Sequence, residues 1–240
     1  MKRITRKNLK SDKFAQEVST IWDWMADHKD EVVRYGAIGL AVLLVAGGIF
    51  YYIRYQAGVR AEALAAALRI DLSNVGAGQP QPGMMQFATQ EEKDKAWAKA
   101  FTEVAVKYHG TQEGAIAAMY IASDDADKGK LAEAEKSYRD VMDSAPKPYN
   151  SMGEMSLAET LDAEGKTADA EKILRNLTQN PSATVSKEEA TIQLGLVIGR
   201  CNQDEARKML EPLRTGRTAV SRAAVQALGD LAQNPGTCNK

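Results

Sequence analysis

One stretch of the chain is continuously apolar, which sets it apart from the mixed polar pattern elsewhere. From Tyr35 to Ile53 the sequence reads YGAIGLAVLLVAGGIFYYI, without a charged side chain. Nineteen residues at about 1.5 Å each give a helix of roughly 28 Å, close to the ~30 Å hydrocarbon core of a bilayer. Arg34 and Arg54 border the run directly. The pattern predicts a transmembrane helix over 35–53.

A cleaved signal peptide is the alternative interpretation of this segment. Its charged region would be 34 residues long and would contain Trp22, Trp24 and six acidic residues, unlike a short basic leader. Tyr55 also places a bulky ring where a small residue is expected before a cleavage site. We therefore expect an uncleaved signal anchor.

The flanking charges predict the orientation of this span. Basic residues are more frequent before it (Lys2, Arg3, Arg6, Lys7, Lys10, Lys13, Lys29 and Arg34) than shortly after it (Arg54, Arg60 and Arg69). Positive flanks favour the cytoplasmic side, so we expect a single-pass protein of the bacterial inner membrane with a cytoplasmic N-terminus and a periplasmic C-terminal domain. The basic first segment, 1–34, also has helical apolar spacing.

Beyond residue 110 the sequence repeats itself at an offset of 36 residues. Residues 129–135 read GKLAEAE and residues 165–171 read GKTADAE, and a third copy, QDEAR, follows at 203–207. Small residues recur at the predicted helix contacts, namely Ala122, Ala134, Ala158, Ala170, Gly195 and Ala206. This pattern resembles the tetratricopeptide repeat, a helix–turn–helix of about 34 residues. The resemblance implies an all-α fold, a helical-hairpin solenoid that follows the single transmembrane helix.

Turn and cap residues predict where the helices begin and end. Gly129 and Gly165 are suited to the turn inside each hairpin. Three capping boxes, 89–92, 151–154 and 186–189, mark helix starts. We expect a cytoplasmic segment 1–34, membrane-proximal helices 54–110 with a loop at 74–88, repeats over 111–217, and a capping helix with a tail over 218–240.

Composition and charge exclude several functional classes. Lys and Arg number 31 against 32 Asp and Glu, and residues 55–240 carry 22 basic and 26 acidic side chains, so we expect no nucleic-acid partner. Two His and two Cys are too few for an internal zinc site of usual spacing. No Gly-rich phosphate loop, HExxH or CxxC occurs. We expect no enzyme activity, no catalytic residue, no metal and no cofactor.

The two cysteines raise a separate question. Cys201 lies at the turn of the last repeat and Cys238 lies near the end of the chain. In an oxidising periplasm a disulfide between them would tie the tail to the stack, although two free thiols are the alternative. We favour the disulfide.

The repeat pattern also predicts a groove for a protein partner. Projection of the first helix of each unit places eight residues on one side: Ile116, Met119, Ser123, Met152, Met155, Glu159, Ile192 and Leu196. Methionine adapts to varied apolar partners, so we expect this side to hold an extended or partly unfolded polypeptide. The alternative is that the C-terminal helix or the 74–88 loop fills the groove and these residues belong to the core.

The order of a basic head, one span and a repeat domain is similar to the YfgM-like ancillary subunits of the bacterial Sec translocon. That resemblance implies a non-catalytic partner of the translocon that hands emerging chains to periplasmic chaperones, with contacts to translocon, chaperones or unfolded clients and to lipid through one span. A scaffold for another envelope complex, in cell division, outer-membrane assembly or cytochrome maturation, shares the same features. The third alternative, an enzyme or small-ligand binder, requires a closed polar pocket that the sequence does not indicate.

Overall fold

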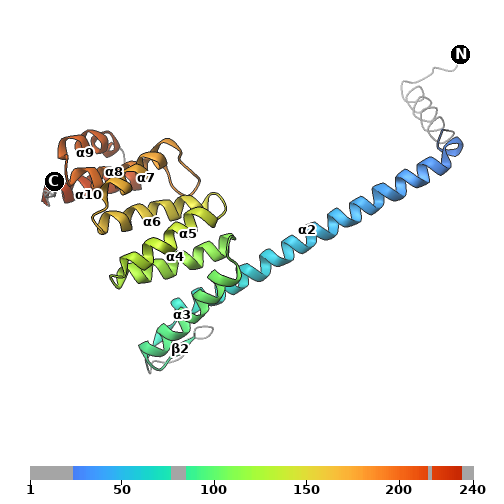
Figure 1. Ribbon diagram of the computed structural model, residues 1–240, viewed down its shortest axis with the longest axis horizontal. Coiled ribbons are helices and arrows are strands. Elements are labelled where there is room, and N and C mark those ends of the chain that lie inside the picture. Colours follow the sequence, from blue (N-terminus) through green and yellow to red (C-terminus); the bar gives the residue numbers. More distant parts are fainter. Residues whose placement is uncertain (1–23, 77–84, 216–217, 234–240) are drawn as a thin grey trace, which may run out of the picture. The chain divides into compact units, whose positions relative to one another are not determined.

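The computed structural model describes residues 24–76, 85–215 and 218–233 (Figure 1). Regular secondary structure in the described part of the chain is helical apart from one pair of two-residue strands. The elements in order are α2 (Lys29–Asp71), β1 (Asn74–Val75), β2 (Gln86–Phe87), α3 (Gln90–Lys107), α4 (Gln112–Asp127), α5 (Leu131–Ser144), α6 (Tyr149–Ala163), α7 (Thr167–Gln179), α8 (Lys187–Gly199), α9 (Gln203–Leu210), a 3₁₀ turn η1 (Glu211–Arg214) and α10 (Ala219–Gln233). The predicted all-α class is confirmed.

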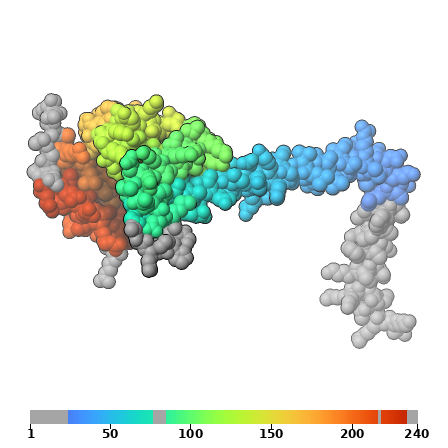
Figure 2. Space-filling model, turned by 90° about the horizontal axis from the view of Figure 1, so that it is seen from below, coloured from blue at the N-terminus to red at the C-terminus, as the bar shows by residue number. Residues whose placement is uncertain are grey.

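The chain divides into two compact units, residues 1–58 and 59–240, and α2 contributes residues to both. The apolar stretch predicted from sequence lies within α2, and all its side chains are exposed. Figure 2 shows them, in blue, at the helix surface. An exposed run of this length and hydropathy is a candidate membrane span. Of the predicted cytoplasmic segment, residues 1–23 lie outside the described part.

Helices α4 to α9 form three antiparallel pairs, α4 with α5, α6 with α7 and α8 with α9. Each predicted small residue of these pairs is buried, and the five alanines have no exposed surface (Ala122, Ala134, Ala158, Ala170 and Ala206). A Cβ at Gly195 would lie 2.8 Å from Cγ of Leu210, so only glycine allows α8 to approach α9 this closely. The small residues therefore set the spacing within each pair.

The turns inside the first two pairs follow the prediction. Gly129 and Gly165 have φ of +76° and +81°, a left-handed conformation that glycine adopts without the strain of a Cβ. Each ends the first helix of its pair and directs the chain into the second.

Two of the three predicted helix caps are confirmed. The hydroxyls of Thr89 and Ser186 accept hydrogen bonds from the backbone N–H groups of Glu92 and Glu189. The third prediction, at Ser151, is wrong, because α6 already begins at Tyr149 and buries Ser151 within its first turn. A cap that was not predicted from the sequence begins α9, where the side-chain oxygen of Asn202 accepts a hydrogen bond from the Glu205 N–H.

The segment predicted as a loop over 74–88 is paired at its two ends. Strands β1 and β2 lie parallel, with Asn74 opposite Gln86 and Val75 opposite Phe87. Residues 77–84, between the strands, lie outside the described part. The pairing brings the end of α2 close to the start of α3, so these helices share an apolar cluster with α4 that includes Leu64, Ala67, Phe101, Val104 and Ala117.

At the other end of the stack, α10 covers the last pair. A Cβ at Gly199 of α8 would lie 2.3 Å from a methyl carbon of Leu231 in α10. Ala206, Leu210, Ala224 and Leu231 belong to one buried cluster. Cys201 is disulfide-bonded, whereas Cys238 lies outside the described residues, so the pairing of Cys201 with Cys238 stays a prediction.

Ion pairs repeat along the second helices of the pairs, α5, α7 and α9, which we call the outer helices. They recur with the same period as the sequence. Glu135 of α5 accepts hydrogen bonds from Lys166 at 2.5 Å and from Arg139 at 2.7 Å. Thirty-six residues later, Arg175 of α7 contacts Glu171 at 2.7 Å and Glu205 of α9 at 3.1 Å. Lys166 and Arg139 lower the pKa of Glu135 to about 2, Lys166 having the larger effect. The pairs therefore link each second helix to the next repeat.

The close contacts of α6 predict the effect of adding one methyl group. A Cβ at Gly153 would lie 2.7 Å from Cγ1 of Val141 and 3.1 Å from the backbone N of Met142. Val141 is β-branched and buried, so Gly153→Ala should destabilise the full chain by about 1–3 kcal/mol despite its better helix propensity. Urea unfolding in detergent micelles, followed by circular dichroism, measures the change.

The matched control is Gly229→Ala in α10, where no neighbouring atom lies within 4 Å of the new Cβ. Alanine should there stabilise the chain by up to about 1 kcal/mol. Equal effects of the two substitutions would contradict the close packing of α5 against α6.

The lowered pKa of Glu135 predicts that Glu135→Gln loses folding stability and that the loss depends on pH. A depressed acid pKa adds stability above the unfolded value of about 4.3, and this stability disappears as pH falls toward the folded value. At pH 7 the variant should lose about 0.5–1 kcal/mol, the range of solvent-screened pairs. Thermal melts at pH 7 and pH 3 should show a smaller difference at pH 3, and the exposed Glu133→Gln should show little at either. A pH-independent loss would contradict the ion pairs.

Candidate protein-binding face

The first helices of the three pairs lie next to one another, α4 against α6 and α6 against α8. Their shared exposed side, which we call the inner face, carries Ser123, Glu159 and Glu189. Ser123 and Glu159 are equivalent positions 36 residues apart, and Glu189 precedes Ile192 of the predicted set by three residues, about one helical turn. Side chains from three repeats therefore contribute to one surface.

The structure divides the eight residues predicted for the groove by their burial. Met155 and Ile192 are buried, with 7% and 8% of their surface exposed. Ile116, Met119, Met152 and Leu196 are half-buried against the core clusters. Only Ser123 and Glu159 are exposed. The methionines thus lie below the surface, and a partner would meet the polar members of the set first.

Glu159 combines an exposed carboxylate with a raised pKa. Desolvation by the surrounding protein is the larger cause, and repulsion from Glu189 is the second. An exposed carboxylate loses part of its hydration when other side chains surround it. This environment is expected on the inner side of a stack of helical repeats. The inner face therefore holds negative charge at an energetic cost.

Tyr138 connects the inner face of α4 to that of α6. Its side chain is buried between the helices, and burial raises the pKa of its phenol, whereas hydrogen bonds with Ser123 and Ser156 act to lower it. Nearby negative charges on Asp127 and Glu159 raise this pKa further. The Tyr138 phenol, on α5, therefore interacts with side chains of both α4 and α6.

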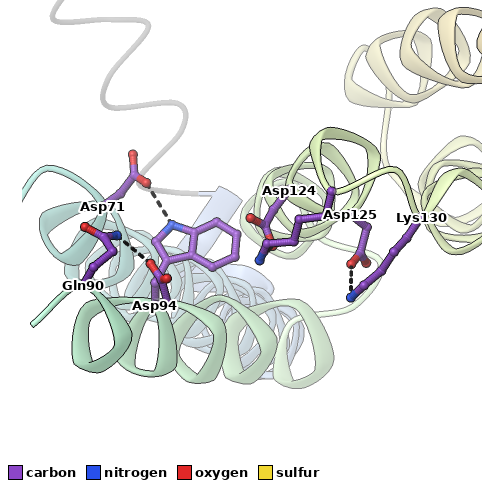
Figure 3. A network of polar contacts seen from close by, with 8 residues as sticks. Asp71, Gln90, Asp94, Asp124, Asp125 and Lys130 are labelled. Atoms are coloured by element: carbon purple, nitrogen blue, oxygen red, sulfur yellow. Dashed lines mark hydrogen bonds and ion pairs between the residues drawn. The ribbon is translucent and has the colours of Figure 1, made fainter.

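A cavity of about 310 Å³ opens between α3 and α4 at one end of this face. We call it the α3–α4 pocket; its lining includes Asp71, Lys93, Asp94, Trp97, Tyr120, Ser123, Asp124, Asp127 and Lys128. Figure 3 shows Asp71 and Asp94 on one side of the polar network and Asp124 on the other. Ser123 is common to the pocket and to the inner face, so the two are continuous.

Hydrogen bonds fix the walls of the pocket. The Trp97 indole N–H donates to Oδ1 of Asp71 at 2.8 Å, and the Gln90 amide donates to Oδ1 of Asp94 at 2.7 Å. Lys93 donates to the carbonyl oxygens of Asp71 and Ser73, at 2.7 and 2.8 Å, which are favourable positions for a cation at the end of α2. The pocket is therefore formed by side chains already held in place.

Two further cavities lie on the outer side and are related by the repeat. One, of about 550 Å³, is lined by residues of α3, α4 and α5 that include Val106, Glu133, Lys136 and Ser137. The other, of about 420 Å³, is lined one repeat later by Met142, Asp169, Lys172 and Ile173. Ile173 and Met142 replace the smaller Ser137 and Val106, which leaves the second cavity smaller.

Sequence reasoning missed Glu189 and the pocket. Glu189 precedes Ile192 by three residues, the same spacing that relates Ile116 to Met119, so the repeat pattern alone identifies it. No sequence pattern indicates the pocket, because it depends on contacts between helices, such as the hydrogen bond that joins Trp97 of α3 to Asp71 of α2, 26 positions away. Among the described residues, no three His, Cys, Asp or Glu side chains are grouped to hold a metal ion.

The raised pKa of Glu159 predicts a stabilising substitution. An acid whose folded pKa exceeds its unfolded value destabilises the chain progressively as pH rises through the folded value. Glu159→Gln should therefore raise the melting temperature at pH 7, and the gain should disappear below about pH 4. Melts of the full chain across this pH range measure it, with the exposed, ion-paired Glu103→Gln as control. A lower melting temperature at pH 7 would contradict the crowding of Glu159 by Glu189.

Comparison with known protein families gives an independent view of this architecture. Residues 24–207 match the tetratricopeptide repeat-like domain, a region that covers most of the 240-residue chain. No curated protein and no solved structure matches the chain. Domains of this kind generally mediate protein–protein interaction and are typically non-enzymatic. The chain belongs to the tetratricopeptide repeat-like family.

Proposed function

We propose that this protein is a membrane-anchored module that binds polypeptides on its inner face and assists their transfer from the translocon to periplasmic chaperones. The repeat domain lies on the periplasmic side of the bacterial inner membrane and the N-terminus lies in the cytoplasm. The proposal has three parts, which are the anchor, the orientation and the client.

The anchor is supported by the exposure of α2. A soluble protein rarely leaves a continuous apolar surface of this size in water, because each buried apolar Å² contributes about 25 cal/mol. Leu43, Leu44 and Phe50 are each about two-thirds exposed or more. Lipid is the natural solvent for such a helix. The excess of basic residues before the span supports the cytoplasmic N-terminus.

The binding role is carried by one observation, that a tetratricopeptide repeat-like domain leaves the inner face of α4, α6 and α8 open to solvent at Ser123 and Glu159. Repeat stacks use such extended surfaces to contact chains over several repeats. Half-buried Met119 and Met152 lie beneath these polar residues and add adaptable apolar contact. An extended or partly unfolded client fits a surface that continues over several repeats and is partly polar.

In-cell photocrosslinking tests this role. A photoreactive phenylalanine replaces Ser123 or Glu159, both exposed, rather than the buried Met155, whose replacement would disturb the core. Exposed Asp143 of α5 and Lys172 of α7 provide matched outer positions. We expect crosslinks from the inner positions to many secreted polypeptides, to translocon subunits and to periplasmic chaperones, and few from the outer positions.

Other outcomes have definite meanings. One folded partner crosslinked from the inner face, with no unfolded clients, would overturn the handover role and favour a scaffold for another envelope complex. Equal crosslinking from the inner and outer positions would contradict the inner face as the binding surface.

A further inference from the structure

The rings of Trp97 and Tyr120 line the α3–α4 pocket, and the buried ring of Phe101 contacts both of them. The rings of Trp97 and Phe101 lie 4.6 Å apart and those of Phe101 and Tyr120 lie 4.9 Å apart, measured between centroids. Phe101 is fully buried, and Tyr120 keeps 38% of its surface exposed. The Trp97 indole is fixed further by its hydrogen bond to Asp71. Aromatic rings of this kind attract cations, most strongly for tryptophan.

The charges of the lining favour the same type of ligand. Four carboxylates, from Asp71, Asp94, Asp124 and Asp127, face two ammonium groups, from Lys93 and Lys128, a formal charge of −2. Lys128 pairs with Asp124 at 2.6 Å, and Lys93 is held by backbone carbonyl groups. Asp94 accepts its hydrogen bond from a neutral amide. Asp71 likewise accepts from the neutral Trp97 indole, so the excess negative charge lies on Asp71, Asp94 and Asp127 rather than on Asp124.

The negative charge continues beyond the pocket along the inner face. Asp127 and Glu159 both act on the Tyr138 phenol, and Glu159 is in turn coupled to Glu189 of α8. We call Asp94, Asp127, Glu159 and Glu189 the acidic strip. Its members come from α3, α4, α6 and α8, and each of these helices packs against the next in that order.

We propose that the α3–α4 pocket holds a lysine or arginine side chain of an extended polypeptide whose other basic residues follow the acidic strip. The aromatic rings contact the alkyl stem and the cationic head, and Asp94 and Asp127 neutralise the charge. A volume of about 310 Å³ is at the lower end of the range of ligand pockets, which suits one side chain. This inference rests on the proposed polypeptide-binding function and specifies the chemistry of the client.

Fluorescence of Trp97 tests the inference directly. The chain has three tryptophans, so Trp22→Phe/Trp24→Phe leaves Trp97 as the single reporter. The full chain is placed in nanodiscs of zwitterionic lipid, which do not attract basic peptides. The probe is an extended Ser- and Gly-rich peptide that carries several lysines, and matched peptides carry glutamine or glutamate at the same positions.

We expect the lysine peptide to change Trp97 fluorescence and to bind about tenfold more tightly than the glutamine peptide, with no binding of the glutamate peptide. Salt should weaken the lysine peptide strongly between about 50 mM and about 500 mM, because exposed charges are screened. Equal affinity of the lysine and glutamine peptides would overturn the inference.

Paired variants locate the effect. Asp94→Asn/Asp127→Asn should weaken the lysine peptide about tenfold and leave the glutamine peptide unchanged. Glu103→Gln/Asp143→Asn removes the same charge from exposed positions outside the pocket lining and should have little effect. Equal losses in both double variants would also overturn the inference, because general attraction would then explain the binding. Circular dichroism melts confirm that each variant is folded.

The result is separable from the broader function. Client crosslinks from Ser123 and Glu159 without any lysine preference would leave the polypeptide-binding role standing and remove the basic-side-chain pocket. Loss of both the crosslinks and the peptide binding would remove both.

Discussion

The close approach of paired helices at small side chains is the constraint on which the stack depends. Ala122 and Ala134 belong to the first pair, Ala158 and Ala170 occupy the same positions in the second, and all four are fully buried in one apolar cluster. Since interiors are packed without room for an extra carbon, the spacing of each pair is fixed by residues that have almost no side chain. The larger residues around them then fill the space between repeats, as Leu161, Leu174 and Leu194 do in the main apolar cluster.

This packing determines where charge accumulates. The second helices, α5, α7 and α9, carry paired charges such as Glu135 with Lys166, which stabilise contacts between repeats. The first helices instead bring Glu159 and Glu189 near each other, and desolvation raises the pKa of Glu159. Glu135 and Glu171 of the second helices are therefore paired with basic side chains, whereas Glu159 and Glu189 of the first helices repel each other. A basic partner would relieve that repulsion, which is the physical basis for proposing one.

The sequence predicted the fold well because its strongest signals are local and periodic. The 36-residue offset identified the turn glycines Gly129 and Gly165, and apolar spacing predicted the helix that became α10. The cap predicted at Ser151 was wrong because the same sequence pattern can also occur inside the first turn of a helix. Only the start of α6 at Tyr149 distinguishes a cap from a position inside the helix. Projection onto an ideal helix also could not separate exposed Glu159 from buried Met155, since burial depends on the neighbouring helices.

The α3–α4 pocket was not predicted from the sequence, because it depends on contacts that hydrophobic periodicity does not encode. Trp97 packs against the apolar cluster of α2, α3 and α4, and its indole N–H also donates a hydrogen bond to Asp71 at the end of α2. Lys93 likewise stabilises that helix end through backbone carbonyl groups. Such long-range polar contacts arise from how α2, α3 and α4 pack, so only the structure reveals that carboxylates and aromatic rings enclose one cavity.

Hydroxyl-radical footprinting of the full chain in nanodiscs, with and without a basic unfolded polypeptide, tests the central claim most directly, because it measures the solvent access of individual side chains. The account predicts protection of Trp97 and Tyr120 in the pocket and of Met119 on α4, with no change at Met142 and Met209 of the outer helices. Protection of Met142 and Met209, with Trp97 and Tyr120 as reactive as before, would contradict it.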